Sequence, residues 1–338
     1  MPRATRVAPT STAPAAPRVG KRALLVLGLA GATSLATGQT AGRPDPARFN
    51  GFDLTGALIP VDAIERGGPP RDGIPAIDKP RFVPAARSSL RDADRILGLS
   101  HKGVVRAYPV RIMNWHEVVN DKPAGDAIAV TYCPLCGTGM AFDARLHSPA
   151  GVRELSLGIS GLLFNSDVLL YDRGTQSLWS QLRQQAVSGP LKGTELKAVP
   201  LEHTTWSDWR RRFPATEVLS FETGFARDYG RDPYAGYEAV NRLMFEVQHR
   251  DARLGPKEWV LGLSVGTARK AYPFSTLATR VGKDGLLEDR LGGQVVRIRY
   301  DAQHRTARAE DGAGKPLPSV LAFWFAWVAF HPQTELLA

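Results

Sequence analysis

The chain has 338 residues, of which 43% are hydrophobic and 22% are charged, proportions that are typical of a folded soluble protein. Its formal net charge of +10 is concentrated at the N-terminus, because residues 1–38 hold five basic and no acidic side chains. This leaves 38 basic and 33 acidic side chains for the other 300 residues. The basic run Arg210–Arg212 is isolated, so the composition excludes an extended phosphate-binding surface and we expect no nucleic-acid binding.

The first predicted element is a secretory signal peptide over residues 1–38. Lys21 and Arg22 precede the apolar run 23–36, and the small residues at 36–38 form a cleavage site. A membrane-spanning helix needs about 20 apolar residues, so we expect no stable span after cleavage; an uncleaved anchor is the alternative. The mature protein is therefore expected in the periplasm or secreted, where thiols oxidise unless a metal or a reductant protects them.

Two stretches recur in the same order and predict an internal duplication. LGLSHKGVVRAYP (97–109) returns as LGLSVGTARKAYP (261–273), and WSDWRRRFPATEVL (206–219) returns as WFAWVAFHPQTELL (324–337). The first pair alternates around a polar turn and predicts a β-hairpin. The W-x-x-W spacing places two indoles on one face of a helix that the following proline ends. The predicted fold is α+β and strand-rich, with two copies of one α/β unit packed as a pseudo-dimer.

The repeats also divide the chain into segments. After the signal peptide we expect an N-terminal arm over 39–90 and a first repeat unit over 91–220. A connecting segment over 221–256 leads to a second, shorter repeat unit over 257–338. The first unit has about 46 more residues than the second between the shared stretches, and these are predicted to include a hairpin.

The chain's two cysteines lie together in the first unit, in the motif C-P-L-C at 133–136 after the strand-like stretch 128–132. In the second unit the same spacing is held by Asp301 and His304, which could close a pseudo-symmetric site. His116 and Glu117 also lack counterparts there, because the register aligns them with arginine and valine. The residues with candidate chemical roles are thus concentrated in the first repeat unit.

Two interpretations of the C-P-L-C motif need no metal. A structural disulfide would close a four-residue loop and contribute only about 2 kcal/mol, which a chain of this size scarcely needs. A redox dithiol has the right spacing. However, the cysteines follow a strand and precede a glycine-rich turn, whereas a helix N-terminus is the usual device for lowering the first thiol's pKa.

The preferred interpretation is a site for copper or zinc. The proline and glycine of C-P-L-C-G bend the chain so that both sulfurs face one ion. Two thiolates are too few for a tetrahedral site, and His116 is the first candidate for a third ligand. Glu117, Met140 and Asp143 are the next candidates, and Met140 would suit a soft ion such as Cu(I).

The extra residues of the first unit, which we call the insertion, add a second group of candidate residues. Its alternation predicts two strands, over 162–171 and 177–181, joined by a turn at 172–175. One face of these strands, which includes Asp167, would carry polar side chains that orient a ligand or a water network; solvated strand residues and a turn-stabilising pair are the alternatives. The candidate ligand-binding residues are Glu117, Ser160, Asn165, Asp172, Arg173, Trp179 and Gln181.

Four long motifs resemble the domain-of-unknown-function family numbered 3179. They are PPRDGIPAIDKPRFV (69–83), NWHEVVND (114–121), VTYCPLCGTGMAFD (130–143) and SGLLFNSDVLLYDR (160–173). The resemblance covers roughly residues 50–335. It implies an exported protein and carries no established activity.

Together these features predict an exported protein that binds copper or zinc through Cys133, Cys136 and His116, with Met140 beside them. Such a protein would act as a carrier, chaperone or accessory factor and would meet an extracytoplasmic partner protein. One alternative is a thiol-disulfide oxidoreductase in which Cys133 attacks and Cys136 resolves. The other is a ligand- or protein-binding module with a structural disulfide. Whether the protein is an enzyme is left open.

Overall fold

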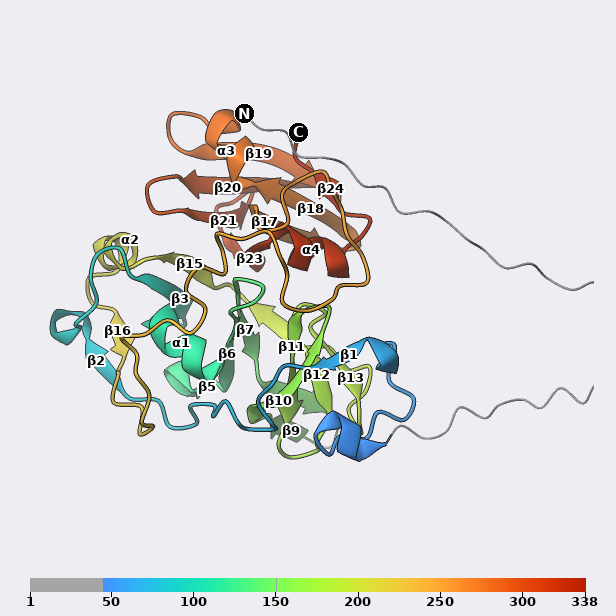
Figure 1. The fold of residues 1–338 in the computed structure, drawn as a ribbon. Helices are drawn as coiled ribbons and strands as arrows, with labels where there is room; N and C mark the ends of the chain where they lie inside the picture. The colour runs from blue at the N-terminus through green and yellow to red at the C-terminus, as the bar shows by residue number, and fades with distance from the viewer. Residues whose placement is uncertain (1–44, 150) are drawn as a thin grey trace, which may run out of the picture. The chain divides into compact units, whose positions relative to one another are not determined.

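The computed structural model describes residues 45–149 and 151–338 (Figure 1). Strands dominate this part of the chain, and its four α-helices have seven residues each. The predicted strand-rich class is thereby confirmed. The predicted signal peptide, residues 1–38, lies outside the described residues. Among the described residues, no helix has both the length and the apolar character needed to cross a bilayer.

The predicted hairpin of residues 97–109 lies in a five-stranded sheet with the order β15-β3-β4-β16-β2. The strands of this sheet are β2 (Phe82–Pro84), β3 (Arg95–His101), β4 (Val104–Pro109), β15 (Glu202–Thr205) and β16 (Glu217–Leu219). Helix α1 (Val110–His116) follows β4, and helix α2 (Trp206–Arg212) follows β15. Strand β16 then returns parallel to β4, next to the hairpin.

The second predicted hairpin lies in a four-stranded sheet with the order β23-β17-β18-β24. The strands of this sheet are β17 (Trp259–Val265), β18 (Ala268–Pro273), β23 (Ser319–Phe323) and β24 (Glu335–Leu336). Helix α3 (Phe274–Arg280) follows β18, and helix α4 (Trp324–Phe330) follows β23 (Figure 1). Strand β24 returns parallel to β18, so the order of elements matches that of the first sheet.

Two further four-stranded antiparallel sheets also correspond in strand order, which is β5-β6-β7-β14 in the first and β19-β20-β21-β22 in the second. The first contains β5 (Val118–Asp121), β6 (Ile128–Cys133), β7 (Thr138–Asp143) and β14 (Lys197–Val199). The second contains β19 (Leu286–Leu291), β20 (Gln294–Asp301), β21 (Thr306–Asp311) and β22 (Pro316–Leu317). Strand β23 lies against β7, and strand β15 lies against β21, so each half of the chain contacts the other.

The insertion forms most of a fifth sheet, with the order β1-β10-β11-β12-β13. Its strands are β1 (Ile64–Arg66), β10 (Leu157–Phe164), β11 (Asp167–Asp172), β12 (Leu178–Ser180) and β13 (Gln185–Ser188), and a separate hairpin precedes it, β8 (Arg145–Ser148) with β9 (Gly151–Glu154). The predicted single strand over 162–171 is wrong. Asn165 and Ser166 both have positive φ, 53° and 63°, and form a tight turn between β10 and β11.

The predicted arm and connecting segment are largely irregular. Between them the arm and the linkers hold four 3-10 helices, Pro46–Phe49, Val61–Ala63, Ala85–Arg87 and Pro123–Gly125. From residue 220 to residue 258 the chain, all of it described, forms neither helix nor strand. We call residues 221–256 the strap, because Tyr234 and Tyr237 of this segment pack against the largest buried cluster.

The predicted W-x-x-W helices are confirmed. Each packs on one sheet through the same kind of contact, an indole ring against a strand glycine. A Cβ atom on Gly98 of β3 would lie 2.4 Å from the ring of Trp209, and one on Gly262 of β17 would lie 2.2 Å from the ring of Trp327. Only glycine allows an indole to lie this close to the strand. The indole nitrogens donate to the hydroxyl oxygens of Thr216 and Thr334, respectively.

Candidate metal centre

The two cysteines flank the turn between β6 and β7. Cys133 pairs with Thr138 at the end of the ladder, and the amide of Cys136 donates to the carbonyl of Cys133 at 3.2 Å. Gly137 follows with a φ of 65°, and a Cβ atom there would lie 2.6 Å from the ring of Trp259. The predicted bend between two strands is therefore present, and it requires the glycine.

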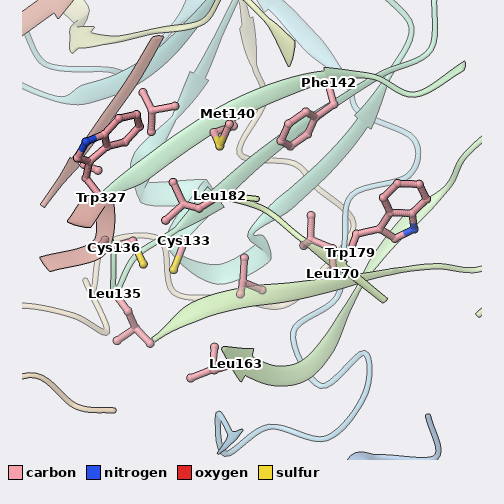
Figure 2. Packing of buried hydrophobic residues seen from close by; sticks show 14 of the residues in the cluster. Cys133, Leu135, Cys136, Met140, Phe142, Leu163, Leu170, Trp179, Leu182 and Trp327 are labelled. Atoms are coloured by element: carbon pink, nitrogen blue, oxygen red, sulfur yellow. The ribbon is translucent and has the colours of Figure 1, made fainter. Parts of the chain in front are cut away.

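Both thiols are free and almost completely shielded from solvent, with exposed fractions of 1% for Cys133 and 0% for Cys136. Their Sγ atoms lie 3.8 Å and 3.4 Å from the carbonyl oxygen of Ser166. A carboxylate oxygen of Asp167 completes a group whose three ligand-type atoms all lie within 4.8 Å of one another. Figure 2 shows the two sulfurs facing each other, with Leu135 nearby.

Ser166 and Asp167 reach the cysteines because of the tight turn that opens β11. Asp167 is 1% exposed, and its Oδ2 accepts a hydrogen bond from the amide of Leu182 at 3.0 Å. Its Oδ1 and the hydroxyl of Ser166 are buried without a hydrogen-bond partner among the described residues. Because such atoms are normally satisfied in native proteins, their position beside two thiols indicates a site for a bound group.

Burial raises the pKa values of the thiols and of the two nearest carboxyl groups. Desolvation raises the pKa of Asp167 to about 7, although the backbone amides at its carboxylate act in the opposite direction. Burial, and then repulsion from Asp167, raises the pKa of Glu117 to about 8. Burial likewise raises the pKa values of Cys133 and Cys136. The site therefore disfavours negative charge unless a cation compensates it.

His116 is held away from this group by two hydrogen bonds. Its Nδ1 lies 2.7 Å from the carbonyl oxygen of Pro75, and its Nε2 lies 2.6 Å from the hydroxyl of Tyr229. The residue ends α1 and is fully buried, and burial lowers its pKa. Both ring nitrogens thus have partners, and the structure brings Asp167 rather than His116 to the cysteines.

The other predicted ligands do not join the three-residue group. Glu117 is 6% exposed and is the C-cap residue that follows α1, with a φ of 56°. Met140 belongs to the same buried apolar cluster as both cysteines, on strand β7 (Figure 2). Asp143 instead forms an ion pair with Arg145 at 2.8 Å, at the far end of that strand.

The predicted ligand-binding residues of the insertion serve separate hydrogen-bond networks. The hydroxyl of Ser160 donates to the carbonyl of Leu169, within the β10–β11 pair. Asn165 links α4 to the strap, because it donates to the carbonyl of Ala329 and accepts from the amide of Gln248. These contacts hold the insertion to other parts of the chain.

The remaining four members of that prediction divide into turn and core residues. Asp172 accepts from two amides of the turn after β11, and Arg173 forms an ion pair with Asp78 at 2.7 Å. The amide of Gln181 donates to the hydroxyl of Thr131 at 2.8 Å. The indole nitrogen of Trp179 and the Oε1 of Gln181 are buried and have no partner in the described part of the chain.

Sequence reasoning placed Asp167 on the polar face of the insertion but did not group it with the cysteines. The signal was present in the Asn165–Ser166 pair, because consecutive residues that tolerate positive φ favour a tight turn over a continuous strand. A turn at this point brings the following carboxylate to the end of a hairpin, where it can meet the C-P-L-C bend.

A second group of ligand-type side chains lies at the corresponding bend of the C-terminal half. Asp301, His304 and Asp208 lie within 4.8 Å of one another, and the Nδ1 of His304 is 2.7 Å from Asp301. Asp208, however, already forms ion pairs with Arg211 and Arg212, both at 2.8 Å. This group is therefore an internally neutralised ion-pair network.

A family model described as "Protein of unknown function (DUF3179)" matches residues 71–334. The chain belongs to this family. The match spans most of the chain and includes the C-P-L-C bend, the Asn165–Ser166 turn and both W-x-x-W helices. Neither a curated protein nor a solved structure matched the chain.

Proposed function

We propose that the protein binds a thiophilic transition-metal ion through Cys133, Cys136 and Asp167. The observation that carries this proposal is the buried, unpartnered Oδ1 of Asp167 beside two free thiols. Removing three such groups from water without a counter-charge is costly, and a cation bound to them offsets that cost.

The donor set favours Zn(II) over Cu(I). Zinc accepts thiolate sulfur together with carboxylate oxygen, whereas Cu(I) prefers thiolate and thioether ligands. The burial of all three side chains is typical of a closed structural or storage site, since catalytic zinc sites keep a position open to water or substrate. The carbonyl oxygen of Ser166, which faces both sulfurs, would be the nearest further donor.

The test is the metal content of the full chain, purified without chelator and measured by plasma mass spectrometry. We expect one zinc per chain, and we expect Cys133→Ser or Asp167→Asn to lower the zinc affinity by about 100-fold or more, which exceeds the loss from removing an outer partner of a ligand. The matched control is Asp301→Asn at the other bend, which should keep full zinc. A metal-free parent protein, or zinc retained in both site variants, would contradict the proposal.

A second candidate function is dithiol–disulfide exchange at the same cysteines. The observation that favours it is that a carboxylate oxygen of Asp167 lies within 4.8 Å of both sulfurs, while burial raises the pKa of that carboxyl group to about 7. It could take the thiol proton as the pair passes two electrons and two protons to a disulfide of a partner protein. A metal-free protein whose thiols are reversibly oxidised by glutathione disulfide would support this function, and full zinc with slow oxidation would not.

The proposed location is the periplasm or the extracellular space, as the sequence predicts. The motif of Lys21 and Arg22, the apolar run and the small residues before residue 39 supports this proposal. N-terminal sequencing of the protein from fractionated cells is the test. A mature chain that begins near residue 39 is expected, and a cytosolic chain that keeps residues 1–38 would be evidence against export.

We also propose that the two halves arose by duplication and pack as a pseudo-dimer. Strands β17 and β18 repeat the register of β3 and β4, with Val260 opposite Pro273 where Ile96 lies opposite Pro109. Asp301 lies opposite Thr306 just as Cys133 lies opposite Thr138. The reciprocal contacts of β23 with β7 and of β15 with β21 support a twofold arrangement. Matched substitutions in the two halves should therefore have matched effects.

A further inference from the structure

A separate cavity of about 240 Å³ lies next to the C-P-L-C-G bend. Residues of both halves of the chain and of the strap line it. Pro134 and Gly137 line it, but neither cysteine does. Trp259 and Phe323 of the C-terminal half supply an apolar wall. The cavity is therefore distinct from the proposed metal centre.

The inner end of this cavity presents a histidine without partners. His203 of β15 is 6% exposed, and neither of its ring nitrogens has a hydrogen-bond partner among the described residues. Its ring packs edge-on against Tyr132 and Trp259, with centroids 6.0 Å and 5.8 Å apart. Burial, and then the charges of Arg95 and Arg305, lower its pKa well below the ordinary value. A buried imidazole with both nitrogens free is costly unless a ligand satisfies it.

Arg95 lies beside His203 and has no ion-pair partner in the described part of the chain. Two of its N–H groups donate to the carbonyl oxygens of His304 and His203, at 2.7 Å and 3.0 Å. A guanidinium has five N–H groups, so three remain for another acceptor. Burial lowers its pKa to about 10, which shows how poorly the surroundings compensate its charge.

The mouth of the cavity has the opposite character. Glu238 of the strap accepts a hydrogen bond from the indole of Trp259 at 2.9 Å and forms an ion pair with Arg305. Asp232 accepts from the side-chain amide of Asn114 at 3.0 Å. Both carboxylates are exposed, so the cavity runs from a partly buried cation, which has no ion-pair partner among the described residues, to a solvated rim that carries two carboxylates.

The geometry points to a binding site for a small organic carboxylate, whose charged end lies between Arg95 and His203 and whose apolar part lies against Trp259 and Phe323. One unpaired guanidinium matches a single negative charge, and its fork of N–H groups matches a carboxylate. A dianion such as phosphate is a poor fit, because it would carry a second charge past Glu238 and Asp232. The apolar wall requires a ligand with carbon to bury.

The test uses benzoate as the probe, with benzamide as its neutral isostere and inorganic phosphate as the competing anion. Each is titrated calorimetrically into the full chain. We expect benzoate to bind at least about tenfold more tightly than either of the others, because hydrogen bonds to a charged group are among the stronger ones. Benzoate that binds no better than benzamide, or phosphate that binds more tightly, overturns the inference.

Two variants locate the site. His203→Leu replaces an unpartnered imidazole with an apolar side chain of similar reach and should weaken benzoate at least about tenfold while leaving the fold intact. Arg95→Met should abolish binding; if that variant fails to fold, His203→Leu decides alone. The control is His147→Gln on the exposed β8, which should bind benzoate as the parent does. Unchanged binding by His203→Leu overturns the proposal, whatever the metal content of the protein.

Discussion

The β6–β7 and β20–β21 hairpins have the same register and opposite electrostatics at their bends. In the first, Cys133 and Cys136 face Asp167, a buried carboxyl group with no ion-pair partner among the described residues. In the second, Asp301 and His304 face Asp208, whose carboxylate is 3% exposed and forms ion pairs with two arginines.

The difference shows what a buried carboxylate needs. Burial raises the pKa of Asp167 to about 7, because no cationic side chain offsets the loss of solvation. Burial acts on Asp208 as well, but hydrogen bonds and charge from Arg212 outweigh it, and its pKa falls below the ordinary value. Among the described residues, the chain supplies its own cations at the second bend and none at the first.

The largest expected effect is on Asp167. Since its folded-state pKa of about 7 lies above the unfolded value, the carboxyl group costs stability as pH rises from about 4 to about 7. In chelator-treated protein, Asp167→Asn should therefore raise the free energy of unfolding by on the order of 3–4 kcal/mol at pH 8 and by little at pH 4.

Urea unfolding at both pH values measures this effect. Glu222→Gln, at a side chain that is 85% exposed, is the control and should change little at either pH. With zinc added, the order should reverse and the parent should be the more stable protein. A metal-free Asp167→Asn variant that is less stable than the parent at pH 8 would show that the carboxylate is compensated from within the chain.

The next effect concerns the two indole contacts. Gly98→Ala and Gly262→Ala should each lower the free energy of unfolding by about 1–3 kcal/mol, because the added methyl group would overlap Trp209 or Trp327. Chemical denaturation should give similar losses for the two variants. Gly255→Ala, where a Cβ atom meets nothing within 4 Å, is the matched control. Clearly unequal losses would speak against a pseudo-symmetric core.

A smaller effect of opposite sign is expected for Asp208. Its folded-state pKa is lowered. The stability that its carboxylate contributes is therefore fully present above the unfolded pKa and is lost as the pH falls through the folded-state pKa. Asp208→Asn should lower the free energy of unfolding by about 1–2 kcal/mol at pH 7. The loss should shrink as the pH falls below about 4, which denaturation curves between pH 3 and pH 7 can follow. A gain in stability at pH 7 would contradict this account.

The smallest effect is expected from transplanting the cysteines. The double variant Asp301→Cys with His304→Cys should bind no zinc at the second bend, because Arg211 and Arg212 neutralise the Asp208 carboxylate. Zinc stoichiometry measured on a Cys133→Ser background isolates that bend. Stoichiometric zinc there would mean that the cysteine spacing alone makes the site.

Local sequence signals predicted much of the scaffold. The hairpin of residues 97–109 and its counterpart follow from alternation, and the helices that begin at Trp206 and Trp324 end before the prolines that were expected to stop them. The bend at C-P-L-C-G lies between two strands, as its proline and glycine indicate. Each of these features depends on residues close together in the chain.

The third member of the group formed with Cys133 and Cys136 was not predicted, because it depends on a long-range contact. Asp167 follows a turn that the alternation of 162–171 conceals, and it meets the cysteines only after two sheets pack together. His116 was the better choice by sequence distance, but its ring nitrogens are engaged by Pro75 and by Tyr229, 113 residues further along. Sequence spacing alone does not contain these pairings.

The strap bears on the rate at which the proposed metal centre would take up and release its ion. Every backbone–backbone hydrogen bond within residues 221–255 joins residues three apart, so no ladder ties the strap to a sheet. Lys257 anchors one end, donating to the carbonyl of Tyr237 at 2.5 Å and lying 3.2 Å above that ring. Its non-local hydrogen bonds run through single side chains instead, such as those of Trp115, Asn165 and Trp324. A segment without a ladder opens at a lower free-energy cost than the sheets. The residence time of the proposed ion should thus be set by strap opening, and amide exchange at residues 221–255 should report that opening.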